Sequence, residues 1–211
     1  MAAMEQVLDV YKRPYNPMRP VVCMDESPKQ LIGETRVPIP MSIGHDRICD
    51  YEYERFGVCN IFLVNEPLAG FRKVKITPRK CKVDWAEFIK EIADQLYPKA
   101  DKITLVMDNL GTHTAGALYE RYEPAEAKRI WDRFEFIYTP KHGSWLNMAE
   151  IELNVVNNQC LGRRIDAIEK VADEVKAWEV ARNGIKRNIN WQFTTKEART
   201  KLKRLYPSYD C

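Results

Sequence analysis

The 211-residue chain lacks the sequence features that mark several large classes of protein. Its six cysteines include no C-x-x-C pair and only three histidines accompany them, so neither a zinc site nor a disulfide framework is indicated. No apolar run approaches the length needed to cross a bilayer. Residues 1–11 show no basic start, apolar stretch or small-residue cleavage site of the secretory kind. We therefore expect a cytoplasmic protein with reduced thiols and no membrane partner.

The length of the chain indicates how many domains it has, and its charge pattern indicates what kind of ligand it binds. A chain of 211 residues accommodates one well-buried domain with helical extensions more comfortably than two domains. The formal charge of +3 is unevenly placed, because 12 Lys and Arg face 7 Asp and Glu from Cys160 onward, against 21 and 23 before it. A basic segment beside an acidic centre suits a protein that grips a polyanion with one surface and holds cations with another.

Two short apolar runs in the chain each end in an aspartate. Val21-Val22-Cys23-Met24 precedes Asp25, and residues 103–107 precede Asp108. This pattern is typical of buried strands that deliver an acidic residue at their ends. The prolines of residues 12–20 indicate a linker before the first strand, and residues 26–50 predict an irregular excursion with a short hairpin near 34–38.

The rest of the chain predicts an alternation of strands and helices. β-branched and aromatic runs at 51–64 and 70–76 indicate an antiparallel pair, and helical spacing of apolar residues indicates a helix over 83–96 capped by Asp84. We further expect a helix near Ala115, a strand over 134–138, a helix starting near Trp145 or Leu146 that carries Glu150, and helices over 166–182 and 195–205. This order predicts an α/β fold with a mixed sheet, three antiparallel strands followed by parallel ones, flanked by helices.

Asp25, Asp108 and Glu150 are candidates for one acidic site. Side chains at the carboxyl ends of adjacent strands point into one cleft, where carboxylates repel each other unless a cation lies between them. Mg²⁺ prefers oxygen ligands, and three carboxylates are a sensible supply for two ions. In two-metal sites, with ions about 3.5–4 Å apart, one ion activates the attacking oxygen and the other stabilises the departing one. Strand-end aspartates also occur in doubly wound folds with unrelated chemistry.

Three blocks carry a more specific signal because they occur in a fixed order. They are Val21-Val22-Cys23-Met24-Asp25-Glu26, Val106-Met107-Asp108-Asn109 through His113, and Ser144-Trp145-Leu146-Asn147-Met148-Ala149-Glu150. These blocks resemble the signature blocks of the DDE endonuclease domain in bacterial insertion-sequence transposases related to the mariner superfamily. The resemblance implies a ribonuclease H-like fold, with Asp25, Asp108 and Glu150 as catalytic residues that bind two Mg²⁺ or Mn²⁺ ions.

The resemblance also implies partners and a domain organisation. It implies cut-and-paste movement of double-stranded DNA, both element ends and target, by a homodimer on DNA that is associated with the bacterial nucleoid. We expect residues 1–20 to be a linker or the remnant of an upstream region, 21–164 to be the catalytic domain, and 165–211 to be a basic helical extension of it. The helix-turn-helix region with which such transposases recognise element ends would precede this chain.

Seven neighbouring residues are second-rank candidates, for support of the carboxylates or for DNA contact. His113 either supports Asp108 or the scissile phosphate, or packs locally at a helix start. Asn109 either orients Asp108 or makes the turn, and Trp145 either stacks on a base or anchors its helix. The remaining candidates precede or begin the helix of Glu150, where phosphate contact and plain solvation are both open: Lys141, His142, Ser144 and Asn147.

Other charged residues compete with these assignments. Glu152 rivals Glu150, but two residues apart on a helix they point about 200° from each other, so only one faces the metals, and the family block favours Glu150. Glu26 is expected to face solvent or a lysine. Five basic residues near the end of the chain either track a DNA backbone or form a solvated helix face: Lys196, Arg199, Lys201, Lys203 and Arg204.

Three functions are therefore open from the sequence. The first is an active transposase domain, in which water cleaves a DNA phosphodiester and the freed 3′-hydroxyl attacks target DNA. The second is a catalytically silent DNA-binding or assembly module derived from a truncated transposase. The third is a ribonuclease H-like enzyme that cleaves RNA–DNA hybrids, which activity on hybrids but not on duplex DNA would favour.

Overall fold

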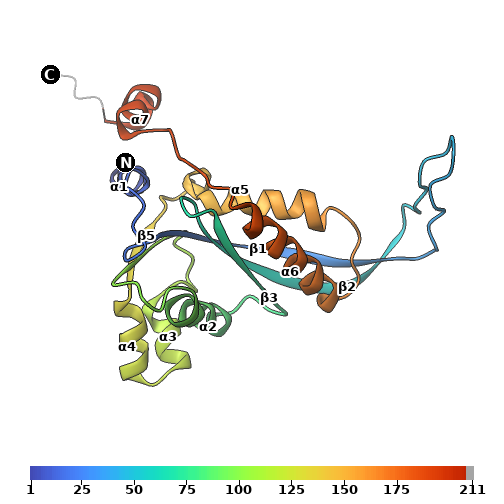
Figure 1. Cartoon of the computed structure of the whole chain (residues 1–211), viewed down its shortest axis with the longest axis horizontal. Coiled ribbons are helices and arrows are strands. Elements are labelled where there is room, and N and C mark those ends of the chain that lie inside the picture. Colours follow the sequence, from blue (N-terminus) through green and yellow to red (C-terminus); the bar gives the residue numbers. More distant parts are fainter. Residues whose placement is uncertain (208–211) are drawn as a thin grey trace.

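Runs of β-branched and aromatic residues form one mixed sheet of five strands in the computed structural model, which describes residues 1–207 (Figure 1). The sheet order is β3-β2-β1-β4-β5. Strands β1, β2 and β3 are antiparallel, whereas β4 and β5 run parallel to β1. The strands are β1 (Val21–Glu34), β2 (Tyr53–Glu66), β3 (Phe71–Thr77), β4 (Ile103–Met107) and β5 (Phe134–Tyr138).

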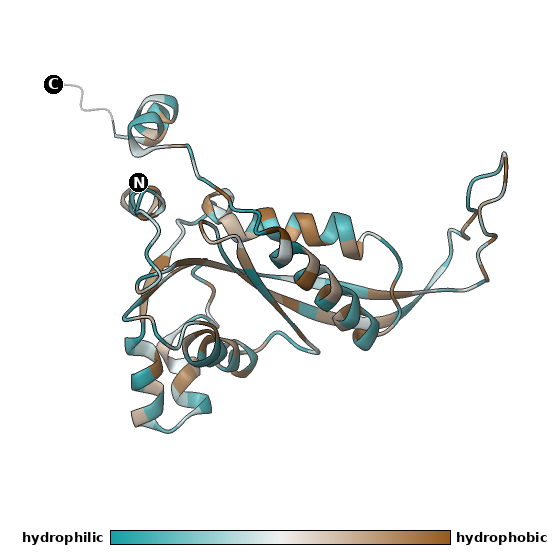
Figure 2. Cartoon of the chain, in the orientation of Figure 1, coloured by the Kyte–Doolittle hydropathy of each residue, from teal (hydrophilic) through white to brown (hydrophobic). Residues whose placement is uncertain are grey.

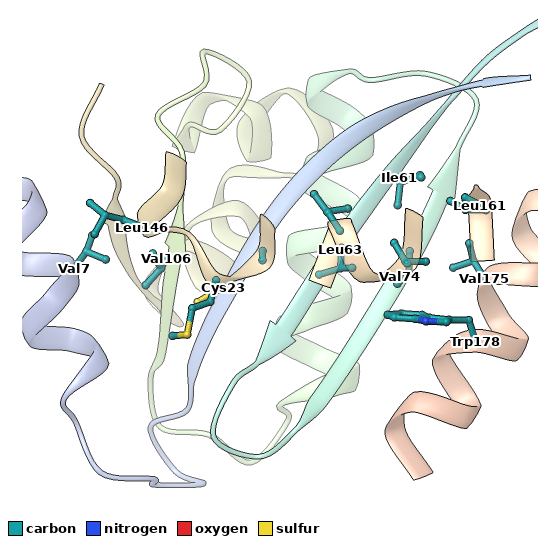
Figure 3. Close-up of a cluster of buried hydrophobic side chains, with 14 of the residues drawn as sticks. Val7, Cys23, Ile61, Leu63, Val74, Val106, Leu146, Leu161, Val175 and Trp178 are labelled. Atoms are coloured by element: carbon teal, nitrogen blue, oxygen red, sulfur yellow. The ribbon is translucent and has the colours of Figure 1, made fainter. Parts of the chain in front are cut away.

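Helices cover both faces of the sheet and bury two separate cores. One face packs against α1 (Ala2–Tyr11), α5 (Met148–Val156) and α6 (Ile168–Ile185), and part of this core is drawn in Figure 3. α7 (Thr195–Lys201) packs on α1 and adds Ala198 to the same core. The other face packs against α2 (Lys82–Glu91), α3 (Ala115–Arg121) and α4 (Pro124–Asp132). Neighbouring residues alternate between the faces, as Cys23 joins the first core and Met24 the second.

This architecture confirms the predicted fold class, an α/β mixed sheet of the ribonuclease H-like kind with antiparallel strands followed by parallel ones. The predicted strands over 103–107 and 134–138 are found with those bounds. The helix expected near Ala115 ends at Arg121, and Pro124 begins a further helix, α4. No helix within residues 1–207 has the length and apolar character that a membrane crossing requires.

The first strand does not end at Asp25, as the sequence suggested, but continues to Glu34. From Asp25 onward β1 pairs only with β2, since its parallel pairing with β4 stops at Cys23 and Val106. The other edge of β1 has no partner strand from this point. Because a strand edge without a partner strand tolerates proline and polar residues, Pro28 and its polar neighbours fit there. The predicted hairpin near 34–38 is likewise wrong, because the chain reverses at Ser42 and His45.

Residues 35–52, here called the arm, project beyond the sheet between β1 and β2 (Figure 1). Backbone hydrogen bonds join Ile39 and Ile48 in both directions. Apolar residues recur along it (Figure 2), and six large ones are exposed: Val37, Ile39, Met41, Ile43, Ile48 and Tyr51. The arm therefore presents apolar surface to solvent.

Residues 1–20, which were expected to be a linker or the remnant of an upstream region, contain a helix followed by a connection. Residues 2–11 form α1, whose apolar side chains Met4, Val7 and Leu8 are buried in the core shared with α5. Only the proline-rich residues 12–20 have the extended character of a connection. The predicted extension over 165–211 is described as far as residue 207, and α6 and α7 pack on the same core.

Candidate catalytic site

The sheet register brings Asp25 and Asp108 to the same level on neighbouring strands. Cys23 on β1 pairs with Val106 on β4, and each aspartate lies two residues further along its chain. Cys23 and Val106 both face the core that contains α5. Because side chains two residues apart on a strand share a face, Asp25 projects on the α5 side, and Asp108 directly follows β4 beside it.

Glu150 reaches this region because the start of α5 is tied to β1. The Asn147 side chain caps α5 by accepting a hydrogen bond from the Ala149 amide at 3.1 Å. Its Nδ2 donates to the carbonyl oxygen of Met24 at 2.8 Å, and Met24 is the residue before Asp25. Asn147 therefore couples the first turn of α5, which carries Glu150, to the strand that carries Asp25.

A second tether to the same helix start comes from α1. The Tyr11 hydroxyl donates to the Leu146 carbonyl at 2.7 Å and accepts from the Met148 amide at 3.4 Å. Tyr11 is buried, and burial raises its pKa well above the usual value, so the hydroxyl remains a donor. The sequence offered no signal for this role, since Tyr11 lies within residues 1–20, which were expected to be a linker or the remnant of an upstream region.

The surroundings of Asp25 oppose the ionisation of its carboxyl group. Burial raises the pKa of Asp25 to about 6, and the nearby charges of Asp108 and Glu150 push it in the same direction. The Glu26 amide, which donates to Asp25 Oδ1 at 2.8 Å, opposes the shift. The ionised site therefore holds negative charge that a cation between these side chains would stabilise.

His113 lies beside Asp108, and both sequence interpretations of this histidine stay open. His113 Nδ1 lies 2.8 Å from Asp108 Oδ1, off the direction of a well-aligned hydrogen bond, and 3.3 Å from the Asp108 carbonyl. This neighbour lowers the pKa of Asp108. The imidazole is 1% exposed and stacks on Trp85 at a centroid distance of 5.5 Å, so it also packs locally.

Glu26 and Lys80 extend this group on the far side of the imidazole. The Glu26 side chain is 2% exposed, with Oε1 2.6 Å from Lys80 Nζ and 3.6 Å from His113 Nε2. The expectation that Glu26 faces a lysine is met, although the carboxylate is buried rather than solvated. Sequence reasoning missed Lys80, which is one of two basic residues in the loop over 78–81 and carries no local signal.

The loop before α5 and the turn after β4 enclose an open cavity of about 660 Å³ beside Asp108. Its lining includes the predicted residues Asn109, Lys141, His142 and Ser144. These four side chains are exposed and available to a ligand, which leaves both phosphate contact and solvation open.

The shape of that loop depends on a tight turn. Gly143 donates to the Pro140 carbonyl at 2.8 Å, and His142 between them has a left-handed backbone with φ of 62°. A Cβ on Gly143 would lie 2.5 Å from Pro140 Cγ, so only glycine fits. The next aromatic, Trp145, is 47% exposed and contacts Phe193 with ring centroids 6.0 Å apart, so it is only partly a packing anchor.

Glu152 is excluded from the site by its position. Its side chain is 0% exposed and pairs with Arg72 and Arg182 on the inner side of α5. The structure thus separates the two glutamates that competed in the sequence, with Glu150 half-buried at the helix start and Glu152 in the core.

The donor set fits a hard divalent cation in its chemistry. Asp25, Asp108 and Glu150 offer only carboxylate oxygens, which Mg²⁺ and Mn²⁺ accept. Burial, and after it the charges of Asp108 and Glu150, raises the pKa of Asp25, and a cation between these carboxylates would favour the ionised form. Within residues 1–207, however, no three acidic, histidine or cysteine side chains already stand close enough to enclose an ion.

A mixed sheet with acidic residues on β1, after β4 and on the helix after β5 is the arrangement of a ribonuclease H-like protein. The model of the DDE superfamily endonuclease family matches residues 20–172, so the chain belongs to that family.

Solved structures of the Mos1 mariner transposase share this fold. The catalytic domain of Mos1 is 11% identical over 88% of this chain and 85% of its own, with a TM-score of 0.55. The Mos1 paired end complex with Mn gives 18% identity over 85% of this chain, with a TM-score of 0.56, and the Mos1 strand transfer complex gives 15% over 88%, with a TM-score of 0.58. The chain spans 53% and 54% of the transposase chains in those two complexes. No curated protein matches the chain in sequence.

Proposed function

We propose that the chain is the catalytic domain of a DNA transposase, which cleaves DNA at element ends and joins the freed ends to target DNA. The observation that carries the proposal is that Asp25 and Asp108 each lie two residues beyond a paired position of neighbouring strands, Cys23 and Val106, with α5 tied to β1 through Asn147 and Met24. Membership of the DDE superfamily endonuclease family supports the same reaction class.

In this proposal the three carboxylates bind two Mg²⁺ or Mn²⁺ ions. When bound, these ions supply activation of the attacking oxygen and stabilisation of the departing one. Asp25 and Asp108 hold their side of the site from adjacent strands, and Glu150 completes it from α5. His113 favours the ionised form of the Asp108 carboxylate, since it lowers the pKa of that group.

Two bond-making steps follow at the same site. Water attacks a phosphodiester at the element end, so that the phosphorus–oxygen bond to the 3′ oxygen breaks and a 3′-hydroxyl is released. That hydroxyl then attacks a phosphodiester of target DNA and displaces the 3′ oxygen of the target strand. Lys141, His142 and Ser144 line the cavity beside Asp108 and contact the DNA backbone.

The partners follow from the reaction. Double-stranded DNA is the substrate, both as element end and as target, and the Mos1 complexes with paired ends and with a transposon end are consistent with this. We extend the proposal to a homodimer on DNA, because two ends must be processed together. The exposed apolar side chains of the arm are surface that a second copy would cover.

The test is cleavage of duplex DNA by the purified chain in Mg²⁺ or Mn²⁺. We expect nicking that is lost with chelator and lost in Asp108→Asn. Asp101→Asn is the matched control, because Asp101 is exposed just before β4 whereas Asp108 follows it. Absence of nicking together with absence of divalent-metal binding by calorimetry would instead identify a silent DNA-binding or assembly module. Cleavage of RNA–DNA hybrids alone would identify a ribonuclease H-like enzyme.

A further inference from the structure

The inner side of α5 carries a buried ionic network that the proposed chemistry does not use. Glu152 Oε1 accepts from Arg72 Nη2 of β3 at 3.0 Å, and its two oxygens accept from Arg182 of α6 at 3.1 and 3.2 Å. Glu152 and Arg72 have side-chain exposures of 0% and 1%. One carboxylate therefore joins the helix of Glu150 to both the sheet and α6.

The arginine side of this network is fixed in turn by backbone groups. Arg72 donates through Nη1 to the Gly70 carbonyl and through Nη2 to the Arg187 carbonyl, both at 2.7 Å. The Asn183 side chain bonds both the amide and the carbonyl of Arg72, at 2.9 and 2.8 Å. Arg72 thus stands in one orientation set by the β2–β3 turn and by the end of α6.

Stability alone does not explain such a network. A buried ion pair gains little over well-packed apolar residues of the same volume, because desolvation offsets the attraction between the charges. A buried, hydrogen-bonded ion pair differs from apolar packing because its bonds form in only one relative position of the elements that carry the two charges. The rest of the buried face of α5, including Ala149, Leu153 and Val156, is apolar and would accept small shifts of the helix.

The position of Glu152 on α5 links the ionic network to the orientation of Glu150. Glu150 and Glu152 point about 200° apart on one helix, so a rotation of α5 that freed Glu152 would swing Glu150 away from Asp25 and Asp108. Asn147 and Tyr11 hold the start of α5, whereas Glu152 holds the next turn. Two anchors on successive turns fix both the position of a short helix and its rotation about its own axis.

We propose that Glu152, with Arg72 and Arg182, is a positioning group that sets the rotation of α5 and so places Glu150 for metal binding. The inference rests on the proposed function. It also gives α6 a part in catalysis, since Arg182 reaches Glu152 from the C-terminal part of the chain.

The test compares Glu152→Gln with Glu179→Gln in the full chain. Glu179 is a matched control, because it also joins α6 to β3, through Lys73 Nζ at 3.2 Å and the Val74 amide at 2.7 Å, but does not bond α5. Measured quantities are the nicking rate at saturating metal, the Mg²⁺ concentration for half-maximal rate, and the affinity for duplex DNA.

We expect Glu152→Gln to slow nicking by about 10–100-fold and to raise the Mg²⁺ requirement, with DNA affinity unchanged. Glu179→Gln should keep the rate and the Mg²⁺ requirement of the unmodified chain, even where thermal stability falls equally. If Glu152→Gln does not fold, variants of Arg182, the more exposed arginine, test the proposal instead. Arg182→Gln should slow nicking, and Arg182→Lys, which keeps the charge, should restore most of the rate.

The outcomes separate the two proposals. An unmodified chain that neither nicks DNA nor binds divalent metal overturns the proposed function and this inference with it. An active chain in which the Glu152 and Glu179 variants behave alike, or in which Arg182→Gln and Arg182→Lys are equally active, overturns the inference alone.

Discussion

At the residue scale, the surroundings of Asp25 oppose the ionisation of its carboxyl group. The carboxyl group is largely buried beside two other acids, and these surroundings raise its pKa from 3.8 to about 6. Ionised Asp25 is therefore less favourable in the folded chain than in the unfolded chain at neutral pH. Its neighbour Asp108 has the opposite shift because His113 stands beside it.

Asp25→Asn should make the metal-free protein more stable at neutral pH, although it removes a proposed ligand. Because the folded pKa is raised, the penalty is absent below pH 3.8, grows up to about pH 6 and is constant above it. We expect a gain on the order of 1–2 kcal/mol in the free energy of unfolding at pH 7.5 with chelator, and none near pH 3.8.

Urea unfolding of both chains at the two pH values measures this difference. Mg²⁺ should then stabilise the unmodified chain more than the variant. Asp101→Asn serves as control, since Asp101 is exposed. Equal stability of the Asp25 variant and the unmodified chain at pH 7.5 would contradict the electrostatic account.

At the element scale, the position of α5 depends on elements far from it in the chain. α1 contributes Tyr11, β1 contributes the Met24 carbonyl, and β3 and α6 contribute the arginines that bind Glu152. A nine-residue helix has little intrinsic stability in water, so these tertiary contacts rather than helix propensity hold it. The N-terminal segment is for this reason part of the unit that positions α5.

Tyr11→Phe should destabilise the protein and slow nicking together. The change removes the hydroxyl from the Leu146 carbonyl and the Met148 amide and leaves both backbone groups buried without that partner. We expect a loss of about 1–3 kcal/mol in the free energy of unfolding, measured by urea denaturation. Tyr15→Phe is the control because Tyr15 is 55% exposed, and a similar loss in both variants would argue against the tether.

At the scale of the whole molecule, ion pairs join segments that are distant in the sequence. Arg13 bonds both oxygens of Glu135 on β5, at 2.7 and 3.0 Å, which lowers the pKa of Glu135 to about 2. Arg199 of α7 bonds both oxygens of Glu5 on α1, at 2.8 and 2.7 Å. The second pair uses one of the five basic residues near the end of the chain, which is therefore not wholly free for DNA.

The Arg13–Glu135 pair predicts an acid-sensitive contribution to stability. Since the pKa of Glu135 is lowered from 4.5, its contribution is present above about pH 4.5 and is lost as the pH falls toward 2. Arg13→Gln should therefore lower the melting temperature at pH 7 but have little effect at pH 2.5. Arg36→Gln is the control, because Arg36 is 78% exposed in its pair with Asp50. A loss from Arg13→Gln that is the same at both pH values would contradict the prediction.

The sequence by itself determined the parts of the fold and site that depend on local patterns. Short apolar runs gave the bounds of β4 and β5, and the strand-end acids and the three signature blocks singled out Asp25, Asp108 and Glu150. These features could be predicted because burial alternates with a fixed period along a strand or helix, so a few consecutive residues reveal it. The choice of Glu150 over Glu152 came from the family block, because helix geometry says only that the two side chains point in different directions.

Only the tertiary structure decided the length of β1, the place of α1 and the partners of the buried charges. Pro28 and its polar neighbours conceal a strand because β1 has a partner on one edge alone from Asp25 onward. Tyr11 meets Leu146, and Arg72 meets Glu152, across long stretches of chain. Whether a charge is buried with a partner or solvated depends on what folding brings beside it, and nothing in the adjacent sequence specifies that neighbour.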